Sequence, residues 1–407
     1  MRSLTRKLDP TVGIYFSHYE CFGHTSRVAA IGEIFKKRFP HGNLFFIQAG
    51  LEQPKSKIDQ LGEVFTLPSP FMSRSSFKES VYPKETDLRS KRCQEIITRH
   101  KPDLFITEFF PLGREECRHE LIPSLIQASK QGAQLWAITG YPLLIGTDNE
   151  WRQKILKFYQ KIIVLSPAIE KKAMADSLLS VTQRQKYSDF FKENEEKIVF
   201  AGYLLPQQEV VKDDTDTNQP KPPMAKGACQ VAVIRGGGAV YPKVIAEAIR
   251  ASDLLGKEYY FTVVAGPSTT TQEWYFFATL IAKKRVSNLI LLRSLGNYEG
   301  LIEKSDVCVS LASYHSSVML LKHQKKAVIV PFVGYEGRSH AEQPARAVML
   351  KKMLSAQIIP YQELTAVALA QSIKKISTRQ AIFKDIPKGW FTGAKVLEKH
   401  LTALSLP

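Results

Sequence analysis

The sequence has no apolar run approaching the ~20 residues that a helix needs to cross a bilayer. Its basic start, MRSLTRKLDP, leads into no apolar signal-peptide core before Pro10. These two absences predict a cytoplasmic protein and leave peripheral contact with the inner face of a membrane open.

Cysteine is scarce, and its residues are scattered without a C-x-x-C pair. The five cysteines are Cys21, Cys93, Cys117, Cys229 and Cys308. Their spacing excludes a disulfide framework and a zinc site, so buried or incidental thiols are expected. The acidic motif Asp214-Thr215-Asp216 has polar flanks and follows no buried strand, so we predict no metal site there.

Acidic side chains are in the minority, with 39 Asp and Glu against 56 Lys and Arg, and the net charge is +17. The excess is spread over both halves and forms no basic tail. A diffuse positive field favours anionic partners such as nucleotides, lipid phosphates, a membrane surface or nucleic acid. A merely soluble basic surface is the open alternative.

A chain of 407 residues, 44% of them hydrophobic, can form two or three domains with cores of their own.

Short β-rich runs alternate with amphipathic helical segments through the first half of the chain. The expected strands are 11–16, 43–48, 103–107, 135–138, 162–165 and 197–201, and the expected helices are 27–37 and 85–100. This alternation predicts a mainly parallel α/β sheet.

A polar, proline-containing stretch separates this half from a second α/β pattern. The second pattern has expected strands at 230–234, 260–265, 289–292, 306–310 and 327–330, and expected helices at 242–251, 316–323 and 388–404. The predicted fold is α/β with two Rossmann-like domains facing across a cleft. The domains are 1–206, a linker at 207–228, 229–387, and a C-terminal helix at 388–407 that packs back on the first domain.

The first candidate for chemistry lies between the first strand and the first helix. There Gly23 permits close approach of a ligand, and His24 can titrate near neutral pH. His24 could deprotonate an acceptor hydroxyl or hold a phosphate at the positive end of the helix. In the alternative interpretation Thr25 or Ser26 only caps the helix and His24 packs.

The second candidate is Arg235-Gly236-Gly237-Gly238, between a strand and a helix. Three glycines let backbone amides approach a diphosphate. The run is neither G-x-G-x-x-G nor a Walker motif, and a plain chain reversal would look the same.

The third candidate surrounds an expected helix start, where the hydroxyls and amides of Ser316 and Ser317 could bind a phosphate. The strand that ends at Pro331-Phe332 would deliver Glu342 and Gln343 to the same edge of the sheet. An acid and an amide suit the hydroxyls of a sugar.

These motifs resemble those of the two-domain GT-B glycosyltransferases. The similarity is greatest to the branch that holds the peptidoglycan N-acetylglucosaminyltransferase MurG and its uncharacterised bacterial relatives, and it runs from about residue 11 to 390. Gly23-His24 matches the family's loop after the first strand, and 236–238 match the glycine loop that opens the second domain. The segments 108–114 and 119–123 resemble a block of the uncharacterised relatives.

The family's donor motif and sugar-binding pair also have counterparts. His315, Ser316 and Ser317 lie in register with the donor motif, and Glu342-Gln343 falls on the Asp/Glu-Gln pair that holds the donor sugar.

Three residues depart from that donor motif. Ser313 replaces a glycine, His315 stands at an Asn/Thr position, and Met319 occupies the place of the Glu that holds the donor ribose. Either another group holds the ribose, the donor is unusual, or catalysis has been lost.

The resemblance implies a metal-independent, commonly inverting hexosyl transfer that needs no cofactor. The C-terminal domain would bind a nucleotide-sugar, expected to be a UDP-sugar, with its diphosphate on residues 236–238 and near Ser316 and Ser317. Arg235 could neutralise part of the leaving charge; a structural surface role for it is the alternative. The N-terminal domain would bind the acceptor, with Gly23, Thr25 and Ser26 around the catalytic His24.

The acceptor itself leaves little trace in the sequence. Lys36-Lys37-Arg38 and the segment 67–82 offer basic and apolar side chains for a lipid-linked or anionic acceptor, or are a solvated helix end and a loop. Three other functions stay open: a sugar-nucleotide epimerase or hydrolase, a non-catalytic GT-B binding module, and a nucleic-acid binder. No recognised nucleic-acid motif supports the last.

Overall fold

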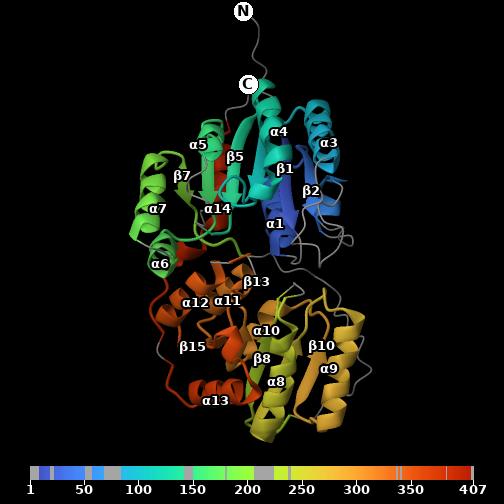
Figure 1. Cartoon of the computed structure of the whole chain (residues 1–407), viewed down its shortest axis with the longest axis vertical. Helices are drawn as coiled ribbons and strands as arrows, with labels where there is room; N and C mark the ends of the chain where they lie inside the picture. Colours follow the sequence, from blue (N-terminus) through green and yellow to red (C-terminus); the bar gives the residue numbers. More distant parts are fainter. Residues whose placement is uncertain are drawn as a thin grey trace, which may run out of the picture. The chain divides into compact units, whose positions relative to one another are not determined.

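The computed structural model describes residues 9–18, 23–50, 57–67, 84–141, 150–178, 181–205, 224–236, 240–335, 338–339, 342–381 and 383–404. The chain divides into two compact units (Figure 1). Unit 1 comprises Met1–Pro206 and Lys388–Pro407, and unit 2 comprises Gln207–Pro387.

Unit 1 is built on a seven-stranded parallel sheet in the order β3-β2-β1-β4-β5-β6-β7. The strands are β1 (Thr11–His18), β2 (Asn43–Gly50), β3 (Glu63–Thr66), β4 (Leu104–Glu108), β5 (Gln134–Thr139), β6 (Lys161–Val164) and β7 (Ile198–Phe200). The central strands are β-branched and aromatic and are buried along most of their length, as expected where helices cover both faces of a parallel sheet. Gly13 leaves room for neighbouring rings, because a Cβ there would lie 2.9 Å from the Phe105 ring.

Helices connect these strands and flank the sheet (Figure 1). They are α1 (Gly23–Arg38), α2 (Ile58–Leu61), α3 (Lys84–His100), η2 (Glu115–Cys117), α4 (Arg118–Lys130), α5 (Glu150–Leu156), α6 (Ile169–Leu178) and α7 (Val181–Glu193). Between α3, α4 and β1, the buried Glu120 carboxylate pairs with Arg89 and accepts from the Tyr15 hydroxyl.

The C-terminal segment belongs to unit 1 through η5 (Lys388–Phe391) and α14 (Gly393–Thr402). Its backbone joins the chain after β7, where the Gly393 amide donates to the Tyr203 carbonyl over 3.1 Å. Arg38 Nε, at the end of α1, donates to Thr402 Oγ1 over 3.0 Å. One of the three basic residues expected to face a membrane or acceptor therefore bonds to the protein's own last helix.

Unit 2 is built on a six-stranded parallel sheet in the order β10-β9-β8-β11-β12-β15. Its strands are β8 (Cys229–Ile234), β9 (Tyr259–Val264), β10 (Leu289–Leu292), β11 (Val307–Ser310), β12 (Lys326–Ile329) and β15 (Ala356–Ile358), with a separate hairpin of β13 (Gly334–Tyr335) and β14 (Arg338–Ser339). Its helices are α8 (Pro242–Leu255), η3 (Gly256–Glu258), α9 (Thr271–Lys284), α10 (Tyr298–Lys304), α11 (Tyr314–Lys322), α12 (Glu342–Met353), η4 (Tyr361–Glu363) and α13 (Ala366–Ser377).

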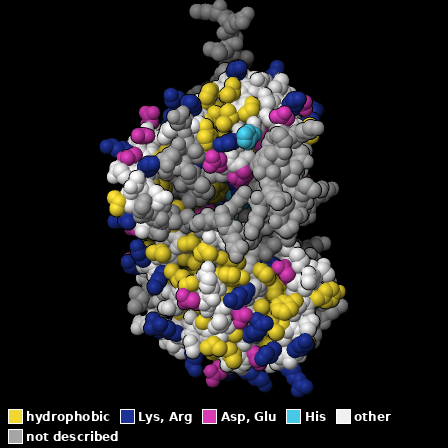
Figure 2. All heavy atoms as spheres, in the orientation of Figure 1, with side chains coloured by type: hydrophobic (Ala, Val, Ile, Leu, Met, Phe, Trp, Pro, Cys, Tyr) yellow, Lys and Arg dark blue, Asp and Glu magenta, His cyan; other side chains and the backbone are white. Residues whose placement is uncertain are grey.

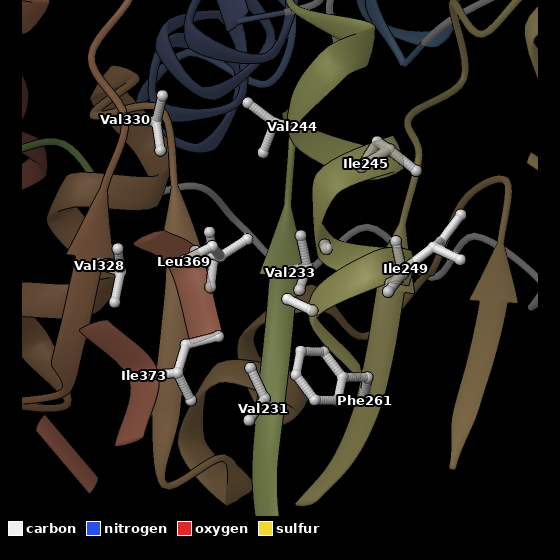
Figure 3. Packing of buried hydrophobic residues seen from close by; sticks show 14 of the residues in the cluster. Val231, Val233, Val244, Ile245, Ile249, Phe261, Val328, Val330, Leu369 and Ile373 are labelled. Carbon is white, nitrogen blue, oxygen red and sulfur yellow. The ribbon is translucent and has the colours of Figure 1, made fainter. Parts of the chain in front are cut away.

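The core of unit 2 forms where α8 and α13 pack side by side on the sheet. Figure 3 shows Ile249 of α8 and Phe261 of β9 on one side of Val231 and Val233, and Leu369 and Ile373 of α13 on the other side. Apolar residues recur at helical spacing on α8 and α13, and burying each such side chain stabilises the unit by roughly 1.5–3 kcal/mol.

The predicted class, α/β with two parallel Rossmann-like sheets, is confirmed. The strands β3 and β15 were missed, because each is only three or four residues long and lacks a continuous apolar run. In the part of the chain that the structure describes, no helix is both long and apolar enough to span a bilayer.

The thiols fit the expectation of buried or incidental cysteines. Cys93, Cys117 and Cys308 are buried, Cys229 is half-buried, and these four are not disulfide-bonded. Burial raises the pKa of the Cys93 thiol to about 12. Cys21 and the motif 214–216 lie outside the described residues, and within the described ranges no group of His, Cys, Asp and Glu could hold a metal ion.

Candidate functional site

The candidate residues of unit 1 lie at the carboxyl ends of adjacent strands. Glu108 is the last residue of β4, which pairs with β1 on one side and β5 on the other. His24 is in the first turn of α1, the helix that follows β1. Ligands of open parallel sheets bind at this edge, so the topology brings the two side chains to the expected place.

His24 and Glu108 form a hydrogen-bonded pair. His24 Nδ1 lies 2.7 Å from Glu108 Oε2 and 3.0 Å from Oε1. The Glu108 side chain is fully buried; although burial raises the pKa of the carboxyl, the charges of His24, Arg27 and Arg114 outweigh it and lower that pKa. Glu108 is therefore an anion, and Nδ1 of His24 carries the proton that the carboxylate accepts.

Arg27 holds the other side of the same carboxylate. It lies one turn after His24 on α1, is buried, and pairs through Nη1 with Glu108 Oε1. Gly140, just after β5, makes room for it, since a Cβ there would lie 2.5 Å from Arg27 Nη2. Phe109, whose φ of +68° is rare for an aromatic residue, packs its ring on both His24 and Arg27. Backbone strain of this kind concentrates at functional sites.

The second ring nitrogen of His24 faces Arg114. Arg114 Nη2 lies 2.9 Å from His24 Nε2, and a guanidinium can only donate. Nε2 therefore carries a lone pair, and the ring is in the tautomer that a general base requires.

The remaining residues predicted around His24 form the start of the helix itself. α1 begins at Gly23, earlier than the expected residue 27, so Gly23, Thr25 and Ser26 belong to its first turn. Thr25 is buried, while Gly23 and Ser26 are half-exposed. Thr25 and Ser26 lie inside the helix and are not its N-cap.

In unit 2, the glycine run and the start of α11 lie together. Gly236 follows β8 with a φ of +83°, and the nearest atom to a Cβ placed there would be Ser313 Oγ, at 3.8 Å. Ser313 precedes α11 and donates to Ser316 Oγ over 2.9 Å. The amides that begin a helix and those of a glycine turn both suit an anion. Gly237 and Gly238 lie outside the described residues.

Buried hydroxyls surround this turn without a hydrogen-bond partner among the described residues. They are Ser310 Oγ, Ser317 Oγ and Tyr298 Oη. Burial raises the pKa of the Tyr298 phenol, and its neighbours Ser316 and the Gly236 backbone lower it, which places the hydroxyl beside the glycine turn. A buried hydroxyl without a partner is costly, and a phosphate oxygen would satisfy it.

Two charged candidates of unit 2, Arg235 and Glu342, form hydrogen bonds or ion pairs with other residues of the same unit. The Arg235 guanidinium is buried; it donates to the Ala265 carbonyl over 2.7 Å and to Thr269 Oγ1 over 2.8 Å. Glu342 pairs at 2.6 Å with Arg346, which also donates to the Ala312 carbonyl before α11.

The other candidates for donor binding in unit 2 are Gln343, His315 and the position of Met319. Gln343 Oε1 accepts from the Phe332 amide over 3.0 Å, which places Gln343 beside the segment that follows β12. His315 is half-exposed and lies edge-on to the neighbouring Tyr314 ring. Met319 is buried within α11.

Sequence reasoning missed several residues at both sites. Glu108 and Arg114 belong to the block 108–114, but nothing in the sequence linked them to His24. Tyr298 and Arg346 carry no motif, and only the adjacency of β8, β11 and α11 shows their place.

No protein-family model matches the chain, and no curated protein sequence matches it. Solved structures do. The glycosyltransferase of kitacinnamycin aligns with a TM-score of 0.57 at 11% identity, over 97% of this chain and 96% of that chain. MurG of Acinetobacter baumannii aligns with a TM-score of 0.56 at 12% identity, over 96% and 95%. A UDP-GlcNAc 2-epimerase from Methanocaldococcus jannaschii aligns with a TM-score of 0.55 at 11% identity, over 98% and 100%. The chain has the GT-B fold, and the resemblance seen in the sequence is confirmed at that level.

Proposed function

We propose that this protein is a glycosyltransferase that moves a sugar from a nucleotide-sugar to an acceptor hydroxyl, with His24 as the general base. The observation that carries the proposal is the hydrogen bond between His24 and the buried, ionised Glu108. It fixes the proton on Nδ1 and leaves the lone pair on Nε2, the nitrogen that a base acting on a hydroxyl requires.

The reaction proceeds as a single displacement. Nε2 of His24 takes the acceptor proton while the acceptor oxygen attacks the anomeric carbon, and the bond from that carbon to the diphosphate breaks. The configuration at the anomeric carbon inverts. Glu108 stabilises the imidazolium that forms, and Arg27 keeps the carboxylate in place.

Unit 2 binds the donor in this proposal. The amides of Gly236 and of the first turn of α11, with the hydroxyls of Ser316 and Tyr298, would hold the diphosphate. Glu342 and Gln343 remain the proposed sugar contacts. Arg235 is left out of the proposed phosphate contacts, because its buried guanidinium is bonded to the loop before α9. We expect UDP as the nucleotide and a metal-independent transfer.

A sugar-nucleotide epimerase is the second candidate, because 2-epimerases are among the similar structures. The two functions differ in their products. An epimerase converts the nucleotide-sugar with no acceptor, whereas a transferase releases the nucleotide only when an acceptor hydroxyl is present.

The charge distribution gives little support to the hypothesis of a nucleic-acid partner. Figure 2 shows Lys and Arg side chains scattered over the visible face of each unit, with Asp and Glu among them. A nucleic-acid binder gathers its positive charge in a patch or stripe.

A nucleotide-binding screen tests the proposal. Thermal unfolding is measured with UDP, GDP, dTDP, CDP and ADP, and then with the sugars of whichever nucleotide binds. A ligand at ~100 times its dissociation constant raises the free energy of unfolding by about 2.7 kcal/mol. Ser316→Ala should reduce that shift, and His24→Gln should keep it while abolishing transfer. His41→Gln, an exposed histidine of the same unit, is the matched control. No shift with any nucleotide would point to a non-catalytic module.

A further inference from the structure

The segment after β4 carries an arginine onto the proposed base. Arg114 Nη2 lies 2.9 Å from His24 Nε2, the nitrogen that must receive the acceptor proton. Arg114 donates and Nε2 accepts, because a guanidinium has no acceptor atom. An acceptor hydroxyl needs the same lone pair, so Arg114 has to leave Nε2 before the proton can move.

The positive charge of Arg114 also opposes protonation of His24 as long as the two side chains are in contact. Proton transfer turns His24 into a cation, and a like charge within ~4–6 Å disfavours that form. The carboxylate of Glu108 is already shared by His24 and Arg27. Glu116 lies 3.6 Å from Arg114 Nη1 and is partly exposed. A further negative charge at Arg114 would therefore favour the protonated base.

A second guanidinium, from α5, contacts the segment after β4. Arg152, in the first turn of α5, is buried and donates through Nε to the Pro111 carbonyl over 2.7 Å. Among the described residues its Nη1 and Nη2 have no hydrogen-bond partner. Burial lowers the pKa of this guanidinium to about 10, opposed by Glu115. Buried charges are normally paired, so a bound anion would satisfy these two donors.

The surface formed by the residues that follow Arg114 is hollowed. An open groove of about 350 Å³ is lined by two cationic or titratable side chains, Arg118 and His119, and by the carboxylates of Glu115 and Glu116. It is large enough for a small polar group and is continuous in sequence with the arginine that covers His24.

We propose that the acceptor carries an anionic group, a phosphate or a carboxylate, beside its nucleophilic hydroxyl, and that Arg114 binds this group. The inference rests on the proposed role of His24 as the base. The anion draws Arg114 away from Nε2, and the hydroxyl takes its place there. A neutral acceptor leaves Arg114 on the base, so Arg114 makes the enzyme selective for anionic acceptors.

Three small probes of matched size test this on the full-length protein. Glycerol 3-phosphate, glycerate and glycerol are titrated by calorimetry, and the ring ¹⁵N signals of His24, assigned with His24→Gln, are followed by NMR. We expect at least one of the two anions to bind and to move the Nε2 signal, and glycerol to do neither. The anion that binds more tightly distinguishes phosphate from carboxylate.

Two arginine variants show whether the anions bind to Arg114. Arg114→Gln should weaken anion binding about tenfold, since a charge-assisted hydrogen-bond pair is lost. Arg92→Gln, which removes an exposed arginine of α3 that lies 3.5 Å from Glu95, should not change it. Binding of neither anion, binding that Arg114→Gln leaves intact, or an equal response to glycerol would overturn the proposal.

A nucleotide arm separates this inference from the proposed function. Arg114→Gln should retain the full thermal shift with UDP, because Arg114 is in unit 1 and the proposed donor residues are in unit 2. If the anions fail while nucleotide binding and His24-dependent transfer hold, only the acceptor inference is lost. If transfer does not depend on His24, the proposed function is lost whatever the anions do.

Discussion

His24 and Glu108, 84 residues apart in the chain, meet at 2.7 Å because their strands are neighbours. β1 and β4 pair in parallel with Tyr15 opposite Thr107, so Glu108 ends β4 two residues before β1 ends at His18, at the same edge of the sheet. The helix after β1 then places His24 over the last residue of β4. The proximity of the proposed base to the carboxylate that orients it is thus a consequence of strand order. The chain adds strands on one side of β1 up to β3 and then on the other side from β4 onward.

Glu108→Gln should abolish most of the transfer while leaving nucleotide binding in place. An amide can still hydrogen-bond to His24, but it cannot stabilise the imidazolium and does not require the proton on Nδ1. We expect the rate to fall by about 10²–10⁴, the usual contribution of general-base catalysis. The measurement is turnover of the donor that the nucleotide screen identifies, with the thermal shift by UDP as the binding readout.

Loss of a buried carboxylate also destabilises the protein, so the control must match that effect. Glu120→Gln breaks the buried pair with Arg89 in the same unit and does not touch His24. Breaking either buried pair should cost about 3–5 kcal/mol. Both variants should therefore unfold at lower temperature, but only Glu108→Gln should lose turnover in its folded fraction. Equal turnover losses would mean that Glu108 acts only through stability.

Tyr298→Phe distinguishes a ligand-binding hydroxyl from a structural one. The hydroxyl is buried beside Ser316 and the Gly236 backbone and makes no hydrogen bond of standard geometry to a described residue. Removing it should leave the melting temperature of the free protein unchanged or slightly raised, because the desolvation of an unsatisfied hydroxyl costs about 1–3 kcal/mol. The shift produced by UDP should become smaller.

The matched control is Tyr275→Phe, which removes an exposed hydroxyl on α9. It should change neither the melting temperature nor the response to UDP. If Tyr298→Phe itself destabilises the free protein and leaves the response to UDP intact, the hydroxyl is structural and the donor site lies elsewhere.

Alternation of β-rich and helical segments was sufficient to predict the fold class. Runs such as 11–16 and 230–234 are unambiguous because a strand buried on both faces needs continuous apolar residues. Short edge strands do not, and β3 (Glu63–Thr66) has only two half-buried residues between two exposed ones, too short a run to stand out.

The sites were harder to predict because side-chain direction and strand order decide them. Arg235 stands next to the glycine run, yet its side chain turns to the carbonyl of Ala265 after β9. His24 was identified from its position after β1, whereas Glu108 could be linked to it only through the pairing of β1 with β4. A residue's position next to a motif showed at which edge of the sheet its side chain lies. It did not show which side chains or carbonyls it bonds to.

Acid should weaken the attachment of α14 through His400. His400 Nδ1 accepts from Lys161 Nζ over 2.9 Å; burial lowers the pKa of the imidazole, and the charges of Lys161 and Lys399 lower it further. The unfolded chain therefore binds this proton more tightly than the folded one. The stability contribution is present above the unfolded pKa of about 6.5 and is lost as the pH falls through the lower folded value.

The measurement is the melting temperature as a function of pH for the wild type and His400→Gln. The difference between the two curves should narrow as the pH falls from 8 to 5, that is, across the unperturbed histidine pKa of about 6.5. His100, whose pKa is also lowered by burial, contributes equally to both curves and cancels. A constant difference over the whole range would mean that His400 does not titrate against Lys161.

Gly202→Ala should detach the C-terminal segment from unit 1, and Gly132→Ala provides the matched comparison. Both glycines have positive φ, +77° and +90°, so each substitution carries the ~1–2 kcal/mol cost of a left-handed alanine. At Gly132 nothing lies within 4 Å of the added Cβ. At Gly202 the Cβ would lie 2.8 Å from the Trp390 carbonyl oxygen, a backbone atom that cannot rotate away. Gly202→Ala should therefore destabilise the protein more and make the segment from residue 388 onward susceptible to limited proteolysis. Equal melting temperatures and equal cleavage in the two variants would show that this backbone contact does not hold the segment.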